Sequence, residues 1–143
     1  MADEIRTLAA RWFDDIWNRR REATIDELMA ADATGHMEGE EVHGQAAFKA
    51  IRAKLLGAMP DLKIVVEDIV ADGDDAVVRW SVTATHKGDQ LGIPATHRAV
   101  AFRGMTWLKF RDGKIVEGWD SWNQGALIQA LLPQAQAASA GDA

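Results

Sequence analysis

The sequence has no cysteine, no tyrosine and only three prolines among its 143 residues. Without cysteine, the chain cannot form disulfides, thiolate nucleophiles or zinc–thiolate sites. No apolar run approaches the ~20 residues that cross a bilayer. The N-terminal segment also lacks the long apolar stretch of a secretion signal. We therefore expect a soluble, cytoplasmic protein that does not contact a membrane.

Positive charge is scarce, since 16 basic residues face 22 acidic ones and the net charge is -6. The one basic run, Arg19 to Arg21, follows a predicted helix, whose C-terminal dipole it complements. This balance argues against nucleic acid as a partner. Gly88 and Gly92 lack the helix that completes a phosphate-binding loop, and no serine lies in a nucleophile elbow. We therefore expect no cofactor.

Apolar periodicity predicts three helices in the first part of the chain. Helical spacing is shown by Ile5, Leu8, Ala9, Trp12, Phe13, Ile16 and Trp17. Because this stripe is rich in aromatic side chains, we expect the helix to pack against the face of a sheet. The capping-box pattern of Thr24 to Glu27 starts a short second helix. After a short strand at 34–37 and a loop at 39–44, a third helix covers 45–59 and ends before Pro60.

From residue 62 the period changes to two, which predicts strands at 62–70, 76–86, 99–110 and 114–122. In the second of these, the face of Val78, Trp80, Val82, Ala84 and His86 is core or pocket, and that of Arg79, Ser81, Thr83 and Thr85 is solvent or a subunit contact. A last helix covers 124–132. Helices followed by an antiparallel meander predict an α+β fold, with one domain at 1–133 and a flexible Ala-rich tail at 134–143.

The turn signal Asp112-Gly113 decides which residue faces Asp120. A two-residue turn pairs Asp120 with Met105, whereas a three-residue loop pairs it with Gly104. The second register is favoured, because it places Leu108 on the Asp120 face with other apolar side chains. Thr106 then lies diagonally beside Asp120, close enough to hydrogen-bond its carboxylate or a ligand.

Asp120 is the candidate catalytic residue, because Trp119 and Trp122 flank it near the end of a strand. A carboxylate among bulky apolar rings loses solvation, and its pKa rises. That is the environment of a general acid or base that works near neutral pH. The plainer interpretation is an ordinary aspartate that bonds to the backbone of the next turn.

Several motifs occur in a family-like order: Pro60-Asp61-Leu62, Val78-Arg79-Trp80, Thr85-His86-Lys87-Gly88, Gly92-Ile93-Pro94-Ala95-Thr96 and Asp112-Gly113-Lys114-Ile115-Val116-Glu117. Together they resemble the SnoaL-like polyketide cyclase family, within the NTF2-like superfamily. The resemblance implies a curved sheet wrapped as a cone around three N-terminal helices, one deep pocket, and a homodimer. It also implies an acid/base aspartate for an aldol ring closure, at Asp120. Where the cyclases carry an assisting histidine, this chain has Thr106.

The remaining candidates surround that aspartate. His36 follows the second helix, where family members often carry a pocket histidine. A metal site from His36, Glu38, Glu40, Glu41 and His43 lacks reliable third and fourth ligands, so we expect no metal. His86 shares the Trp80 face but lies at the end of the strand, so it is expected to face solvent, with a place at the pocket mouth as the alternative. His97 is expected to be exposed in its loop. The predicted substrate-binding wall consists of Trp17, His36, Trp80, Thr106 and Trp122.

Three functions are compatible with this pattern. The first is a cofactor-free cyclase or isomerase that acts on a small apolar carbonyl compound through Asp120. The second is a small-molecule-binding or interaction domain without chemistry, since the fold serves both uses. The third is a hydration reaction such as epoxide opening, which usually needs an arginine between two aspartates in the pocket. Arg79 is predicted to point to the outer face, which argues against this reaction. Lack of tyrosine also removes the phenolic donor of ketosteroid isomerases.

Overall fold

The computed structural model describes residues 2–132, so Pro133 and the predicted tail at 134–143 lie outside the described residues. Its elements are α1 (Ala2–Phe13), the π-helical turn η1 (Asp14–Asn18), α2 (Ala23–Leu28), β1 (Met29–Met37), β2 (Glu40–His43), α3 (Gly44–Ala58), β3 (Lys63–Asp72), β4 (Asp75–Thr85), β5 (Ala99–Arg111), β6 (Lys114–Trp122) and α4 (Gln124–Leu131). Within residues 2–132, no helix combines the length and the apolar character needed to span a bilayer.

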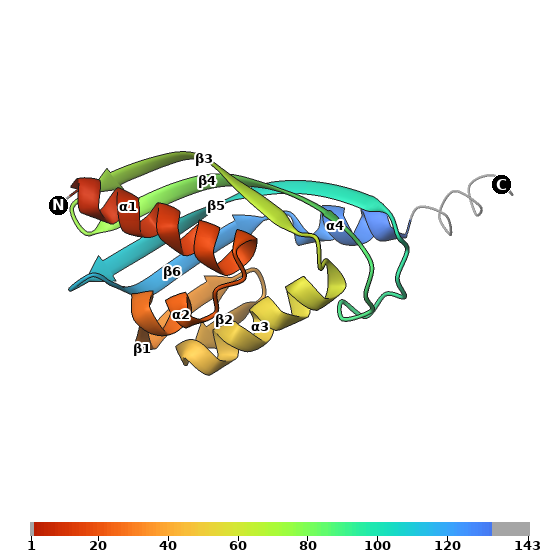
Figure 1. Cartoon of the computed structure of the whole chain (residues 1–143), viewed down its shortest axis with the longest axis horizontal. Coiled ribbons are helices and arrows are strands. Elements are labelled where there is room, and N and C mark those ends of the chain that lie inside the picture. Colours follow the sequence, from red (N-terminus) through yellow and green to blue (C-terminus); the bar gives the residue numbers. More distant parts are fainter. Residues whose placement is uncertain (1, 133–143) are drawn as a thin grey trace, which may run out of the picture.

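The six strands form one sheet in the order β2-β1-β6-β5-β4-β3. Neighbouring strands are antiparallel, except that β1 runs parallel to β6. The meander β3 to β6 was predicted from the sequence, and Figure 1 shows it as the long upper part of the molecule. The α+β class is confirmed.

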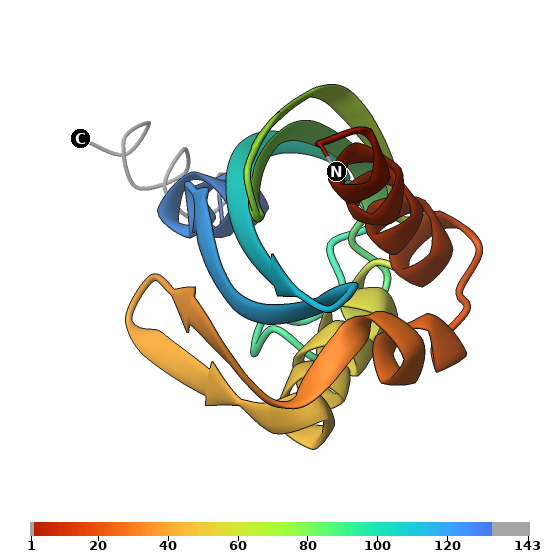
Figure 2. The ribbon, with the colours of Figure 1, turned by 90° about the vertical axis from the view of Figure 1, so that its left-hand side faces the viewer.

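The sheet is strongly curved, and the helices close its concave side. Viewed end-on, β3 to β6 curl around a central space, with α1 on one side and α3 below (Figure 2). The first helix packs on β3 and β4, and α3 packs on β1 and β2. The predicted cone, wrapped around three N-terminal helices, is therefore the shape of this chain.

The core lies between this concave face and the helices. On β4, Val78, Trp80 and Val82 are buried, as the alternation predicts, and Arg79 is exposed. His86 continues the buried face and is fully buried, so its expected exposure is wrong. The loop at 87–98 covers it, because the backbone N–H of Thr96 donates to His86 Nδ1 (3.2 Å). His97 is exposed, as expected.

The first two helices differ in detail from the prediction. The stripe of α1 continues to Trp17 only through the π-helical turn η1. Thr24 does not cap α2, which begins at Ala23 and has no side-chain cap. Instead the buried Thr24 hydroxyl donates to Asp15 Oδ2 (2.7 Å), so the polar side chain joins α2 to η1.

The segment after α2 is more regular than predicted. The strand expected at 34–37 begins at Met29, and the expected loop at 39–44 contains β2. Ala-Ala-Asp-Ala-Thr-Gly is poor in the branched and aromatic residues that mark strands. Its strand conformation comes from pairing with β6 on one side and β2 on the other.

The hairpin between β5 and β6 has a two-residue turn, in which Asp112 (φ 53°) and Gly113 (φ 78°) are both left-handed. The favoured three-residue loop is therefore wrong. A bulge follows, because Phe110 pairs with Ile115 whereas Lys109 pairs with Glu117. This extra residue restores the predicted faces.

Candidate active site

An apolar pocket occupies the space between the sheet and the helices. It is lined by Trp12, Phe13, Trp17, Met29, Ala33, Thr34, Gly35, Met37, Val42, Phe48, Ile51, Leu55, Leu62, Ile64, Trp80, Val82, Phe102, Thr106, Leu108, Ile115, Gly118, Asp120 and Trp122. Of these lining side chains, only that of Asp120 ionises. The cavity volume is about 110 Å³, which is room for several waters or a small organic molecule.

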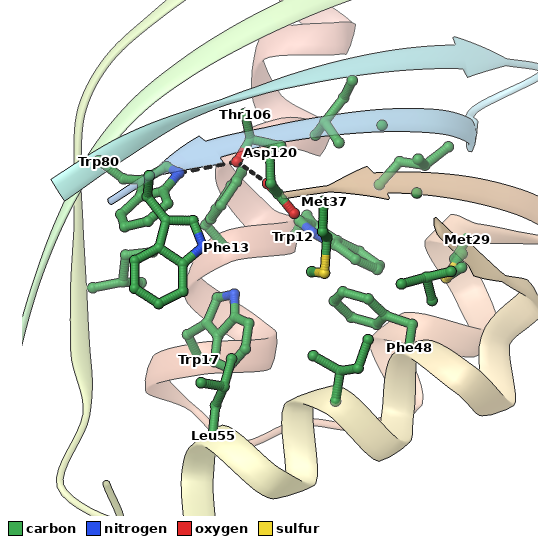
Figure 3. Close-up of a pocket in the computed structure, with 18 of the residues that line it drawn as sticks. Trp12, Phe13, Trp17, Met29, Met37, Phe48, Leu55, Trp80, Thr106 and Asp120 are labelled. Atoms are coloured by element: carbon green, nitrogen blue, oxygen red, sulfur yellow. Dashed lines mark hydrogen bonds between the residues drawn. The ribbon is translucent and has the colours of Figure 1, made fainter. Parts of the chain in front are cut away.

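Asp120 lies on β6, directly opposite Thr106 on β5. The Thr106 hydroxyl donates to Asp120 Oδ1 at 2.5 Å, and the indole N–H of Trp80 donates to Thr106 Oγ1 at 2.9 Å. Figure 3 shows this line of hydrogen bonds at the top of the pocket, with the second oxygen of Asp120 pointing into the cavity. Thr106 thus contacts the carboxyl directly, rather than diagonally as predicted.

Burial raises the pKa of the Asp120 carboxyl above its ordinary value, and the hydrogen bond from Thr106 opposes part of that rise. The cause is desolvation, since an ionised carboxylate loses water in an apolar cavity and gains no positive partner there. From the sequence, we expected Trp119 and Trp122 to desolvate this carboxyl. Trp122 does line the pocket, whereas Trp119 points to the outer face and is 37% exposed.

Five of the six predicted site residues meet in this pocket: Trp17, Trp80, Thr106, Asp120 and Trp122. They come from η1 and from three neighbouring strands. Gly104 permits part of this arrangement, because a Cβ there would lie 2.7 Å from the Trp80 ring and 2.6 Å from Trp122 Cβ. A larger residue at this position would keep the two indoles apart.

His36 is the sixth predicted residue, and the expectation that it lines the pocket is wrong. It lies beside Trp119 in the β1–β6 register and stacks on that indole, with ring centroids 5.4 Å apart. Its Nε2 is 2.7 Å from Glu117 and its Nδ1 is 3.3 Å from Glu41. His36 therefore joins β1, β2 and β6 on the outer face.

The sequence missed the walls supplied by α3 and β1. Phe48 and Leu55 lie within the helix predicted at 45–59 but were not expected in the pocket, and Gly35 and Met37 were not considered for it. The 3.6-residue period of α3 could have suggested its wall. Nothing in the local sequence placed β1 beside β6, since that pair is parallel and far apart in the chain.

The described part of the chain holds no group of three or more side chains suited to a metal ion. Arg79, the arginine considered for hydration chemistry, is exposed and absent from the pocket lining. The site offers one carboxyl of raised pKa, the hydroxyl of Thr106 beside it, and aromatic walls. Such a set can bind a flat apolar molecule and exchange a proton with it.

Comparison with known proteins gives the family. The model of the family described as SnoaL-like polyketide cyclase matches residues 7–131. The chain belongs to the SnoaL-like polyketide cyclase family. The resemblance carried by the short motifs is thereby confirmed. None of the curated proteins matches the sequence.

Solved structures of SnoaL-like proteins share this fold. AclR from Streptomyces galilaeus, assigned provisionally as a hydroxylase, is 31% identical, with a TM-score of 0.83 over 92% of this chain and 97% of that one. A provisionally assigned SnoaL-like polyketide cyclase from Jannaschia sp. CCS1 is 24% identical, with a TM-score of 0.85 over 91% and 92%. IdmH from Streptomyces antibioticus, provisionally a polyketide cyclase, is 25% identical, with a TM-score of 0.76 over 90% and 98%.

Proposed function

We propose that this SnoaL-like protein is a cofactor-free enzyme of the cyclase or isomerase kind. Its substrate is a small apolar carbonyl compound of polyketide type, and Asp120 transfers the proton. The observation that carries the proposal is a lone ionisable side chain, Asp120, in an otherwise uncharged pocket rich in indole rings. Membership of the family supports the same class of reaction.

In the proposed aldol ring closure, the carboxylate of Asp120 removes a proton from a carbon next to a carbonyl. That carbon then attacks a second carbonyl carbon of the same molecule, forming the new carbon–carbon bond. The proton ends on the oxygen of the attacked carbonyl, which becomes a hydroxyl group. The raised pKa supports this role, because an acid/base group works best when its pKa approaches the working pH.

The negative charge that develops on the carbonyl oxygen needs a hydrogen-bond donor. The chain has no tyrosine. The resemblance to the cyclases implies that Thr106 stands where they carry a histidine. The Thr106 hydroxyl is already directed at Asp120. Trp17 is a better donor candidate, because Figure 3 shows its indole nitrogen at the cavity. We assign this N–H the task of binding the substrate carbonyl.

A second function, ligand binding without chemistry, is favoured by the same replacement at Thr106, which removes the assisting histidine. Trp fluorescence tests the pocket under both functions. We expect saturable quenching by anthraquinones or steroids and none by nucleotides or sugars. The reverse result would contradict an apolar ligand.

Turnover separates the two functions. Polyketide esters in which the carbon next to one carbonyl can reach a second carbonyl and close a ring are incubated with wild type and with Asp120→Asn, and products are identified by mass spectrometry and NMR. Asp120→Asn should lose ~10²–10⁴-fold in rate, the usual share of general acid–base catalysis. Asp112→Asn, in the exposed turn, is the matched control and should keep full activity. Unchanged turnover in Asp120→Asn would leave only the binding function.

A further inference from the structure

Three side chains on adjacent strands form a chain of hydrogen bonds that ends at the pocket carboxyl. Trp80 on β4 donates to Thr106 on β5, which donates to Asp120 on β6. Trp80 and Thr106 are 6% and 5% exposed, so bulk water competes little for these bonds. No other side chain of the described residues makes a hydrogen bond with Asp120. The geometry of this carboxyl therefore depends on the chain.

The chemistry of the three groups gives the chain one direction. An indole N–H can only donate, and a threonine hydroxyl has a single proton. The Thr106 oxygen accepts from Trp80, and Asp120 Oδ1 is the one acceptor that the Thr106 proton meets among the described residues. A reversed bond, in which a neutral Asp120 donates to Thr106, would leave this buried hydroxyl proton without a partner. The ring also cannot turn freely, since it is packed edge-on against Phe102 and Trp122.

This direction assigns different tasks to the two carboxyl oxygens. Oδ1 accepts the Thr106 proton whether Asp120 is ionised or neutral. A proton held by the carboxyl therefore lies on Oδ2, the oxygen that points into the cavity (Figure 3). We propose that Trp80 is a positioning residue that acts through Thr106 to keep the exchangeable proton of Asp120 on Oδ2. The inference rests on the proposed function, which makes this proton the one that is transferred.

Removal of the indole N–H would weaken the donation from Thr106 to the carboxylate, because hydrogen bonds in a chain strengthen one another. A weaker donation to the ionised form raises the pKa of Asp120. No competing charge complicates this, since α1, η1, α3 and the strands contribute only non-ionising side chains to the rest of the lining.

The test is a titration that needs no substrate. Protein labelled with ¹³C at the aspartate carboxyl carbons is titrated by NMR, and the Asp120 signal is the one missing in Asp120→Asn. The variants are Trp80→Phe, Thr106→Val, Thr106→Ser and the double variant Trp80→Phe/Thr106→Val. Trp122→Phe is the matched control, because this indole contacts Trp80 but makes no hydrogen bond with Thr106 among the described residues. The same spectra show whether each variant is folded.

We expect Trp80→Phe and Thr106→Val each to move the Asp120 midpoint to higher pH. Thr106→Ser keeps the hydroxyl and should titrate like wild type. Trp122→Phe removes a similar part of the apolar wall but no hydrogen bond to Thr106, so it should not move the midpoint to higher pH. In the double variant the midpoint should equal that of Thr106→Val alone, because Trp80 has then lost its only route to the carboxyl. A role of Trp80 as mere pocket wall predicts no such dependence on Thr106.

Three results would overturn the inference: an unchanged midpoint in Trp80→Phe, an equal shift in Trp122→Phe, or a Trp80→Phe shift that persists without the Thr106 hydroxyl. Failure of the proposed function is seen elsewhere, as full turnover in Asp120→Asn. That result would remove the transferred proton from the account even if all midpoints moved as expected.

Discussion

At the scale of single residues, the site depends on which side chains face inward on β5 and β6. Trp119 and Asp120 are neighbours in sequence and lie on opposite faces of the sheet. Strand alternation placed Trp80 on the inner face of its strand and placed Asp120 and Trp122 on one face of theirs. Selecting Asp120 as the acid/base residue also needed the resemblance to the cyclases. Alternation could not assign His36, because the irregular pairing of β1 with β6 sets its direction.

Gly104 provides a prediction at this scale. A methyl group there would lie 2.7 Å from the backbone oxygen of Ser121, which cannot move without disturbing the sheet. We expect Gly104→Ala to lower the free energy of unfolding by ~1–3 kcal/mol, the usual cost of overpacking. Urea denaturation measures it. Gly35→Ala is the control, because its methyl would lie 3.7 Å from Val42 Cβ and 4.0 Å from the Val42 backbone oxygen, which are ordinary contact distances. Equal stability of the two variants would contradict the crowding at Gly104.

At the scale of elements, the meander and the three helices followed from periodicity, and the errors lie where tertiary contacts override it. The sequence of β1 has weak strand propensity, yet it pairs on both sides. Thr24 has the pattern of a cap but is used to bond Asp15. The hairpin bulge after residue 115 has no marker in the turn sequence. Each of these depends on partners distant in sequence or on a shift within a strand pair.

The contact of His36 with Glu117 and Glu41 predicts a pH-dependent link between β1, β2 and β6. The hydrogen bond that His36 donates to Glu117 is the main cause that raises the pKa of His36 above 6.5. A raised pKa means that the stabilisation is complete below about pH 6.5 and is lost as pH rises through the folded-state value. Wild type should therefore lose stability across this step.

The measurement is the urea midpoint at intervals from about pH 6 to about pH 9, taken against the ordinary histidine pKa of about 6.5. Over this pH range the urea midpoint of His36→Asn should fall less than that of wild type, because the variant has no histidine at this contact. His97→Asn, which changes an exposed histidine, should keep it. An identical pH dependence in wild type and His36→Asn would show that this contact contributes nothing measurable.

At the scale of the molecule, the outer face of the sheet is more apolar than the sequence suggested. The strip expected there was polar, as it is on β4 around Arg79. On β5 and β6, however, Met105 is 52% exposed, Trp107 is 48% exposed and Trp119 is 37% exposed. Trp107 and Trp119 pack edge-to-face at 6.0 Å. A patch of this kind marks interaction surfaces on soluble proteins.

We therefore keep the homodimer as a prediction and assign it to this face. Wild type should sediment as a dimer at micromolar concentration, and Trp107→Glu should sediment as a monomer, because a charge would be buried at the contact. Sedimentation equilibrium gives both masses. A wild-type protein that shows only the monomer mass would reject the dimer.

The account as a whole depends on the state of one carboxyl in an apolar cavity. Its most direct test is the ¹³C titration of Asp120 in the wild-type protein, with the signal assigned by its loss in Asp120→Asn. The account predicts a midpoint above the ordinary aspartate value of about 3.9, because desolvation outweighs the hydrogen bond from Thr106. A midpoint at or below that value would contradict it, since the carboxyl would then be well solvated and unsuited to proton transfer near neutral pH.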